Sequence, residues 1–470
     1  MPDFVKRLFA LRGIDFQEDA PPVQELYRQN IAIAWPATVE GALISIIGSV
    51  DTAMVGKLGS GAIAAVGITT QPRMILLLLA QSLCVGTTAL IARRKGEDNR
   101  ASANSVLAQS MYLVTALGIL TTLIGYFFAE PFMRMAGANE DTLLWATEYF
   151  QVVSLGFLFN SWSLCLCAGM RAVGQTRITM VANITANLVN VFLNYGLIEG
   201  HWGFPALGVK GAAIATLCGT IVGAGIAFWF AIQGDGFLHF RPSAPRFDRE
   251  TLRGLLRIGS SSMVEGACLR AGFFLNTKLV AGNGTAALAT YQIVSQTTSL
   301  SFTLGDGLGI AGATLVGQSL GAKRKDLAQA NVQISRKLSI VSSVLLMLVI
   351  LFGRRQIALF FTKEPEIIAD AMLAFLVIIT GILPQNGRVV FSGCLRGAGD
   401  VRYVAMCSLI SVTILRPLCT YLFCYPLNGL LPMAMLSVTG PWIAFVLDAF
   451  VREYLLYRRI KQGKWLNIRL

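Results

Sequence analysis

The chain has 470 residues, of which 54% are hydrophobic and 14% are charged. Soluble domains carry about 25% charged residues, so this composition, with a mean hydropathy of +0.61, excludes a soluble globular protein. The formal net charge of +13 could indicate nucleic-acid binding. Most of the basic residues lie in alternate loops, however, as a membrane topology signal requires, and we expect no nucleic-acid partner.

Residues 1–29 precede the first apolar run and are predicted to form a cytoplasmic N-terminal tail. The apolar core of this segment is too short for a cleavable signal peptide, and Lys6, Arg7 and Arg12 interrupt it. Its apolar residues follow helical spacing. Two alternatives therefore stay open, a short helix on the membrane surface and a disordered tail.

Long apolar runs then recur along the whole chain. A helix needs about 20 apolar residues to cross a bilayer, and short polar loops separate runs of this length. The short alternating segments of a membrane barrel are not seen. We predict twelve spans, at 30–53, 63–92, 103–129, 142–167, 178–198, 208–233, 254–281, 287–317, 330–353, 366–391, 401–424 and 432–457.

Two stretches of the chain repeat each other at a constant offset in residue number. The sequence EGA at 40–42 recurs at 265–267, and Arg171 recurs at the same offset as Arg396. Unrelated segments would not keep one register over such a length. We therefore predict two copies of a six-helix unit, with an N-lobe at 30–233, a cytoplasmic interlobe linker at 234–250, a C-lobe at 251–457 and a cytoplasmic C-terminal tail at 458–470.

Lysine and arginine predict the orientation. One set of loops is rich in basic residues, as at Arg93-Arg94-Lys95 and Lys323-Arg324-Lys325, and both ends of the chain are basic. The opposite set is sparse. The positive-inside rule places both termini in the cytoplasm, which agrees with an even number of spans. Both copies then enter the membrane in the same direction, so the repeat is of the parallel kind.

The first candidate site joins Asp51, toward the outer end of the first span, to the fifth span. Four asparagines there are spaced by four, three and four residues, which places their amides on one helix face. Lipid would not tolerate such a stripe, so it must face protein or a water-filled cavity. Thr216 of the sixth span reaches a compatible depth. The four asparagines are Asn183, Asn187, Asn190 and Asn194.

A buried carboxylate with amide and hydroxyl oxygens around it is suited to hold a proton or Na⁺. Burial disfavours the charged form, so Asp51 could load and unload a proton near neutral pH. The alternative, which stays open, is that the amides only hydrogen-bond helices together. We expect the coupling ion to bind at Asp51, Asn187, Asn190, Asn194 and Thr216, and Na⁺, if it is used, at Asp51, Asn190, Asn194 and Thr216.

Further intramembrane charges predict a cargo cavity. Glu40 and Glu265 occupy matching positions of the two copies, near mid-depth, where ionisable groups are functional candidates. Each could instead pair with a nearby base and only hold helices together. The remaining charges are mixed, which leaves cationic, zwitterionic and anionic cargo open, and Arg73 and Lys278 are expected to snorkel to the outer interface. The predicted cargo residues are Glu40, Glu265, Arg270, Asp306 and Arg416.

No sequence signature of an enzyme or a cofactor is found. There is no phosphate loop and no HExxH motif. The nine cysteines form no CxxC pair, and with only two histidines a zinc site is not expected. We expect no cofactor other than H⁺ or Na⁺ as the coupling ion.

Residues 50–59, VDTAMVGKLG, resemble the multidrug and toxic compound extrusion (MATE) family of secondary transporters, within the MOP flippase superfamily. Residues 171–177, RAVGQTR, and their echo at 396–402, RGAGDVR, are similar to the paired cytoplasmic loops of that family. The resemblance covers essentially the whole chain. It implies an all-α integral membrane protein with twelve transmembrane helices in two pseudo-symmetric six-helix bundles around a V-shaped central cavity.

The resemblance also implies a cation site in the N-lobe, made of Asp51, Asn190, Asn194 and Thr216. Many members of the family carry Asp where this chain has Asn194. Some sodium-coupled members have an acid in the middle of the tenth span, and residues 373–390 contain none. These two departures favour protons over Na⁺.

The expected function is a cation-coupled secondary antiporter, with H⁺ favoured, that exports small amphipathic organic compounds by alternating access. We expect a monomer in the cell inner membrane. The alternatives are a flippase for a lipid-linked precursor and an exporter of one metabolite, both within the same superfamily.

Overall fold

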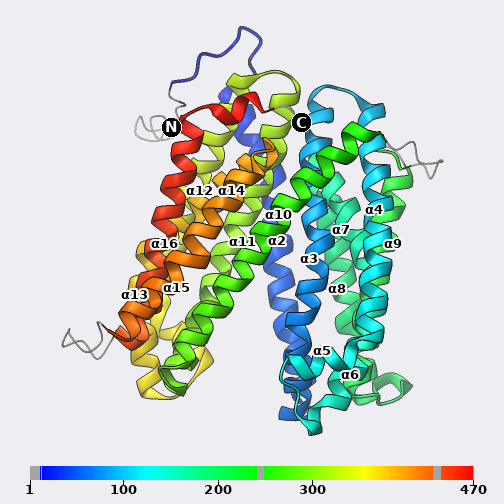
Figure 1. The fold of residues 1–470 in the computed structure, drawn as a ribbon, viewed down its shortest axis with the longest axis vertical. Helices are drawn as coiled ribbons and strands as arrows, with labels where there is room; N and C mark the ends of the chain where they lie inside the picture. The colour runs from blue at the N-terminus through cyan, green and yellow to red at the C-terminus, as the bar shows by residue number, and fades with distance from the viewer. Residues whose placement is uncertain (1–10, 12, 234–235, 241–247, 427–435, 469–470) are drawn as a thin grey trace. The chain divides into compact units, whose positions relative to one another are not determined.

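The computed structural model describes residues 11, 13–233, 236–240, 248–426 and 436–468, and the regular structure in these ranges is helical (Figure 1). In the first half of the chain the helices are α2 (Val23–Gly56), α3 (Ser60–Gly96), α4 (Arg100–Phe127), α5 (Ala129–Met135), α6 (Glu140–Leu155), α7 (Phe157–Ala172), α8 (Thr176–Glu199), η1 (His201–Gly203) and α9 (Val209–Gln233). In the second half they are α10 (Arg249–Ala281), α11 (Thr285–Gly321), α12 (Lys325–Phe361), α13 (Pro365–Gly397), α14 (Val401–Ser408), η2 (Leu409–Leu415), α15 (Arg416–Cys424), α16 (Leu436–Lys461) and η4 (Lys464–Asn467).

The number of spans follows from these helices. Among the described residues, nine helical segments are long and apolar enough to cross a membrane, with α14, η2 and α15 counted as one. Helices α6 and α7, bent by 46° at their junction, form a tenth. Helices α10 and α16 have the required length but carry more charge. With these two the structure has the twelve spans that the sequence predicts. The described residues do not include positions 1–10 of the predicted tail or 234–235 and 241–247 of the predicted linker.

Matching turns occur in the two halves of the chain. Gly59 and Gly284 have φ values of +106° and +103°, and Gly174 and Gly399 have φ values of +90° and +88°. Side chains other than hydrogen rarely allow this backbone conformation. Because the two members of each pair occupy equivalent positions of the duplicated stretches, the repeat seen in the sequence is also a repeat of backbone geometry.

The contacts divide the chain into two compact units. The unit Val39–Met263, called the N unit below, contains most of the predicted N-lobe. The second, called the C unit, combines Met1–Thr38 with Val264–Leu470. The predicted lobe boundaries of 30–233 and 251–457 are therefore corrected inside α2 and α10, because the N-terminal half of each helix belongs to the other unit.

Hydrogen bonds and close backbone contacts explain to which unit the N-terminal halves of α2 and α10 belong. In the C unit, the Asn30 amide of α2 donates to Asn331 Oδ1 of α12 at 2.8 Å and accepts from Ser335 Oγ at 2.9 Å. In the N unit, a Cβ atom on Gly86 of α3 would lie 3.2 Å from the main-chain oxygen of Leu255 of α10. Such buried hydrogen bonds and close backbone approaches hold membrane helices together.

Glycines of α9 bring this helix close to α8. A Cβ atom on Gly211 would lie 2.4 Å from the Leu197 main-chain oxygen, and one on Gly219 would lie 2.6 Å from that of Ala186. No side chain fits at these points. The close approach places Thr216, between the two glycines, against the asparagine row of α8.

Candidate functional site

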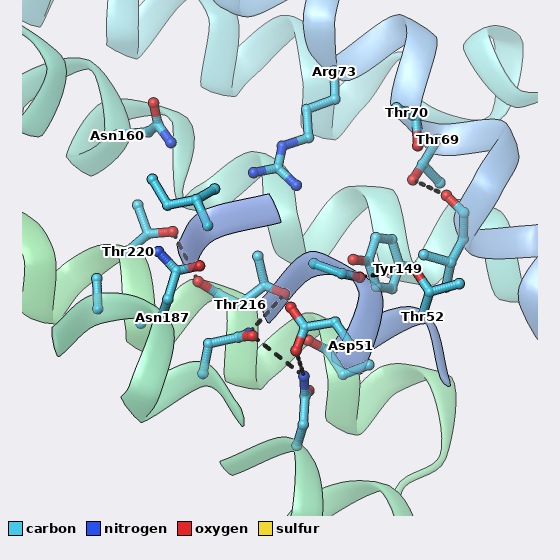
Figure 2. Close-up of a pocket in the computed structure, with 18 of the residues that line it drawn as sticks. Asp51, Thr52, Thr69, Thr70, Arg73, Tyr149, Asn160, Asn187, Thr216 and Thr220 are labelled. Carbon is cyan, nitrogen blue, oxygen red and sulfur yellow. Dashed lines mark hydrogen bonds between the residues drawn. The ribbon is translucent and has the colours of Figure 1, made fainter. Parts of the chain in front are cut away.

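Asp51 of α2 lies beside the asparagine row of α8 (Figure 2). Asn194 Nδ2 donates to Asp51 Oδ1 at 2.9 Å. When the Asn190 amide nitrogen faces the acid, it donates to Oδ1 at 3.0 Å and to Oδ2 at 2.8 Å, and the amide oxygen accepts from Thr216 Oγ1 at 3.2 Å. Asn190 and Asn194 are 6% and 2% exposed. The acid is therefore held by two amides that water hardly reaches, and Thr216 fixes one of them.

The orientation with the amide nitrogen toward Asp51 is the one that satisfies both ends of the Asn190 amide. In the reversed orientation, its nitrogen donates to Thr216 Oγ1 at 3.2 Å and its oxygen accepts from Asn194 Nδ2 at 3.3 Å. The oxygen then faces Asp51. An ionised carboxylate only accepts hydrogen bonds, whereas a protonated one can donate to an amide oxygen. The reversed orientation therefore suits Asp51 only when the acid carries a proton.

The fifth predicted coupling residue, Asn187, lies apart from this cluster. Its amide nitrogen donates to the Asn183 main-chain oxygen at 2.7 Å, one turn earlier on α8. Asn187 lines the same cavity as Asp51, but no hydrogen bond between the two is found among the described residues. The structure thus brings together Asp51, Asn190, Asn194 and Thr216, and it leaves Asn187 as a lining residue.

Metal binding is limited by the kinds of side chain present. Within the described ranges, no group of three or more His, Cys, Asp or Glu residues could hold a metal ion. An Na⁺ ion at Asp51 would need neutral oxygens to complete its shell, since hard cations take oxygen ligands. Asn194 Oδ1, which is buried without a hydrogen-bond partner, and Thr216 Oγ1 are the available candidates.

The cluster opens into a cavity of about 720 Å³ inside the N unit. Its walls come from α2, α3, α6, α7, α8 and α9 and combine apolar side chains with hydroxyls and amides. Arg73 of α3 also lines it, and Figure 2 shows the guanidinium directed into the cavity. The expectation that Arg73 snorkels to the outer interface is therefore corrected. Nothing in the sequence around Arg73 could have shown this direction.

Glu40 is buried against residues of its own unit. It is 6% exposed and accepts from Asn183 Nδ2 at 2.7 Å and Thr179 Oγ1 at 3.1 Å. Arg171 lies 3.6 Å from Oε1. Glu40 does not line the 720 Å³ cavity. Its surroundings match the alternative in which the acid pairs with a base.

Glu265 has the same kind of surroundings in the C unit. It is 2% exposed, and Arg396 donates to its two carboxylate oxygens at 2.5 and 3.2 Å. Arg452 Nη2 and Ser408 Oγ each lie 3.4 Å from Oε1. For both Glu40 and Glu265 the contacts therefore favour the alternative in which the acid pairs with a base, and their role toward cargo stays a prediction. Their bases Arg171 and Arg396 are distant in sequence and lie at matching positions, in the loop repeats RAVGQTR and RGAGDVR.

The other predicted cargo residues differ in their contacts. Arg416 is 2% exposed, forms a buried ion pair with Asp448 and lies over the rings of Phe273 and Phe445. Arg270 is partly buried, and its Nε has no hydrogen-bond partner in the described chain. Asp306 is exposed on α11, with no hydrogen bond or ion pair among the described residues.

The C unit carries a neutral counterpart of the Asp51 cluster. Asn276 is the residue equivalent to Asp51 in the repeat. It accepts from Thr420 Oγ1 at 2.6 Å and donates to the Tyr291 hydroxyl at 3.0 Å. Thr420 is 144 residues after Asn276, whereas Asn194 is 143 residues after Asp51. The C unit therefore has one residue more than the N unit between these two positions, and the π-helical turn η2 accounts for it. The same shift places Arg416 at the position equivalent to Asn190.

A twelve-span helical protein with an internal repeat, no cofactor signature and a charged intramembrane cavity has the construction of a secondary transporter. The MatE family model matches residues 36–196 and again 262–422. The chain therefore belongs to this family, the MATE transporters of the MOP superfamily, and the double match agrees with the duplication.

Related proteins share nearly the full length of the chain. It is 28% identical over 450 residues to the probable multidrug resistance protein NorM of Thermotoga maritima, with 94% of each chain covered. It is 26% identical to the multidrug resistance protein PmpM of Pseudomonas aeruginosa, covering 82% of this chain and 81% of the other. An outward-facing structure of a multidrug resistance MATE family transporter has the same fold, with a TM-score of 0.86, 21% identity and coverage of 96% and 99%.

Proposed function

We propose that this transporter is a proton-coupled antiporter that exports small amphipathic organic compounds by alternating access. The observation that carries the proposal is Asp51, a carboxylate held by Asn190 and Asn194 at the wall of a 720 Å³ cavity. Cavities of about 300–1,000 Å³ are typical of sites for drug-sized ligands. The names of the relatives NorM and PmpM support multidrug efflux as the physiological activity.

Coupling requires that ion binding and cargo binding affect each other. An ion shifts an equilibrium between two conformations only by the difference in its affinity for them. A 100-fold difference would supply about 2.7 kcal/mol. Asp51 can provide this difference because its proton changes both the charge of the cavity and the orientation that the Asn190 amide must adopt.

The geometry of the amides favours a proton over Na⁺ as the coupling ion. Asn194 donates to Asp51 Oδ1, and Asn190 can donate to both oxygens, so amide nitrogens occupy lone pairs that a metal ion would need. A proton needs one lone pair and an acceptor, which the reversed Asn190 supplies. Na⁺ at Asp51, Asn190, Asn194 and Thr216 is the alternative for the coupling ion.

The remaining features of the proposal concern the cellular setting. The bacterial relatives and the twelve spans support a multi-pass protein of the cell inner membrane. The distribution of basic residues supports cytoplasmic termini. A monomer with one cargo cavity is sufficient for the mechanism, since Asp51 and its polar partners all come from one chain.

The proposal is tested in inverted membrane vesicles, with a fluorescent cationic dye added outside, on the cytoplasmic face. Dye transport should stop when an ionophore removes the pH gradient and should persist when Na⁺ is replaced by K⁺. Asp51→Asn should abolish transport while dye binding stays measurable. Asp141→Asn, which removes an exposed acid at the start of α6, is the matched control and should transport normally. Normal transport by Asp51→Asn would contradict the proposal.

A further inference from the structure

Arg73 places a positive charge in the Asp51 cavity that proton coupling does not use. It lies on α3, lines the cavity, and points toward its interior in Figure 2. In the part of the chain that the structure describes, its guanidinium has no hydrogen bond and no ion pair. Arg73 and Asp51 are the two charged side chains among the residues that line the cavity.

An unpaired arginine inside a membrane span calls for a partner. Charged residues there are costly and mark functional pathways. The guanidinium has five N–H donors in a planar fork, a geometry that matches a carboxylate or a similar anion through two parallel hydrogen bonds. Because Arg73 faces the cavity rather than the lipid interface, an anionic partner would reach it from within the cavity.

Two amides extend the group of donors around the same cavity. Asn160 of α7 and Gln81 of α3 line it, and neither side chain has a hydrogen bond among the described residues. Figure 2 shows Asn160 directed into the cavity as well. Apolar side chains such as Met74 and the Tyr149 ring form other parts of the wall. An aromatic or aliphatic body that carries an anionic group fits this lining.

We propose that Arg73 binds the anionic group of a zwitterionic cargo whose cationic group lies toward Asp51. The inference rests on the proposed function and adds the chemical class of the cargo. With Asp51 ionised, the cavity presents one negative and one positive charge, which a zwitterion matches. A proton on Asp51 removes only the partner of the cationic group, so it expels the cargo as exchange requires. A purely anionic compound would bind better to the protonated cavity, which would oppose exchange.

The test uses two fluorescent ligands that differ in one charge. An unesterified rhodamine is a zwitterion, and its methyl ester is a cation with nearly the same shape. Binding to the purified transporter is measured by fluorescence anisotropy. Arg73→Gln should weaken binding of the zwitterion by about tenfold or more, because a charge-assisted pair is lost. Binding of the ester should change by less than about twofold. Arg73→Lys keeps the charge without the planar fork and should lie between Arg73→Gln and the wild type for the zwitterion.

The matched control is Arg134→Gln, which removes the same charge from an exposed position of α5. It should leave both affinities unchanged. The assignment of Arg73 is overturned if Arg73→Gln weakens both rhodamines equally, or weakens neither. If in that case Asp51→Asn still abolishes proton-driven transport of the ester, the proposed function stands and only the cargo class is wrong. If wild-type transport of both dyes ignores the pH gradient, the proposed function fails, whatever Arg73 binds.

Discussion

At the scale of single residues, the central feature is one amide. Asn190 connects Asp51 of α2 to Thr216 of α9, because its amide nitrogen donates to the carboxylate and its oxygen accepts from the Thr216 hydroxyl. A leucine in its place would have a similar size but no polar atoms. Removing one partner of a buried polar group costs more than the hydrogen bond itself, since the other partner stays unsatisfied.

Asn190→Leu should therefore lower the initial rate of proton-driven dye transport by about tenfold or more, because it removes about 1–3 kcal/mol of stabilisation from one state of Asp51. Asn187→Leu is the matched control, since Asn187 lines the same cavity from the same helix and its amide nitrogen bonds to the Asn183 main chain, with no hydrogen bond to Asp51 among the described residues. The rates are compared at equal protein content in vesicles. Equal losses for the two variants would show that Asn190 has no special relation to the acid.

The ion pair of Arg416 with Asp448 carries a second prediction at this scale. Both side chains are at most 2% exposed, so removing one leaves a buried charge without its partner. Breaking a buried pair typically costs about 3–5 kcal/mol, whereas replacing both members by apolar residues is often neutral. Arg416→Met and Asp448→Leu should each lower the midpoint of thermal unfolding in detergent, and the double variant should recover most of the loss. An additive loss in the double variant would contradict this account.

At the scale of helices, the close contact of α8 with α9 builds the Asp51 cluster. Gly219 of α9 meets the Ala186 main-chain oxygen at a distance that excludes a side chain, while a Cβ atom on Gly225 would meet nothing within 4 Å. Both residues belong to the same helix. Substitutions at Gly219 and Gly225 therefore separate the effect of lost helix contact from that of a lost glycine.

Gly219→Val should push α9 away from α8, separate Thr216 from Asn190 and reduce transport strongly. Overfilling of this kind typically costs about 1–3 kcal/mol of stability. Gly225→Val should have little effect on transport or on stability. Unfolding midpoints and transport rates of both variants provide the measurement. Unimpaired transport by Gly219→Val would show that the close approach is not needed.

At the scale of the whole molecule, duplication has produced two units that differ at the position of Asp51. The C unit has Asn276 where the N unit has Asp51, and its residue equivalent to Asn190 is Arg416, already paired with Asp448. An amide at the position of Asp51 has no carboxylate to load and unload a proton. The two buried clusters around Glu40 and Glu265, by contrast, both keep an acid with an arginine.

The orientation in the membrane is the prediction at this scale. A green fluorescent protein fused after the last residue should be fluorescent, and alkaline phosphatase fused at the same point should be inactive, because the basic loops hold both termini in the cytoplasm. A phosphatase fused in the loop between α2 and α3, after Leu58, should be active. The opposite pattern would reverse the orientation and with it the direction of proton entry.

The sequence predicts the span number, the duplication and the Asp51 cluster, because these depend on hydropathy, register and helical spacing. It does not predict the bases that bind Glu40 and Glu265, which are distant in sequence, although the repeat of Arg171 as Arg396 points to them. The direction of Arg73 and the division of α2 between two units depend on tertiary contacts. Asn276 could have been found by applying the constant offset of the repeat to Asp51.

The most direct test of the central claim measures protons rather than dye. The transporter is placed in liposomes that contain a pH-sensitive fluorophore, in buffers without Na⁺, and a dye gradient is imposed. Dye movement should drive protons in the opposite direction through the wild type, whereas Asp51→Asn should move none. Proton movement by Asp51→Asn at the wild-type rate, or dye exchange by the wild type with no proton movement, would contradict the central claim.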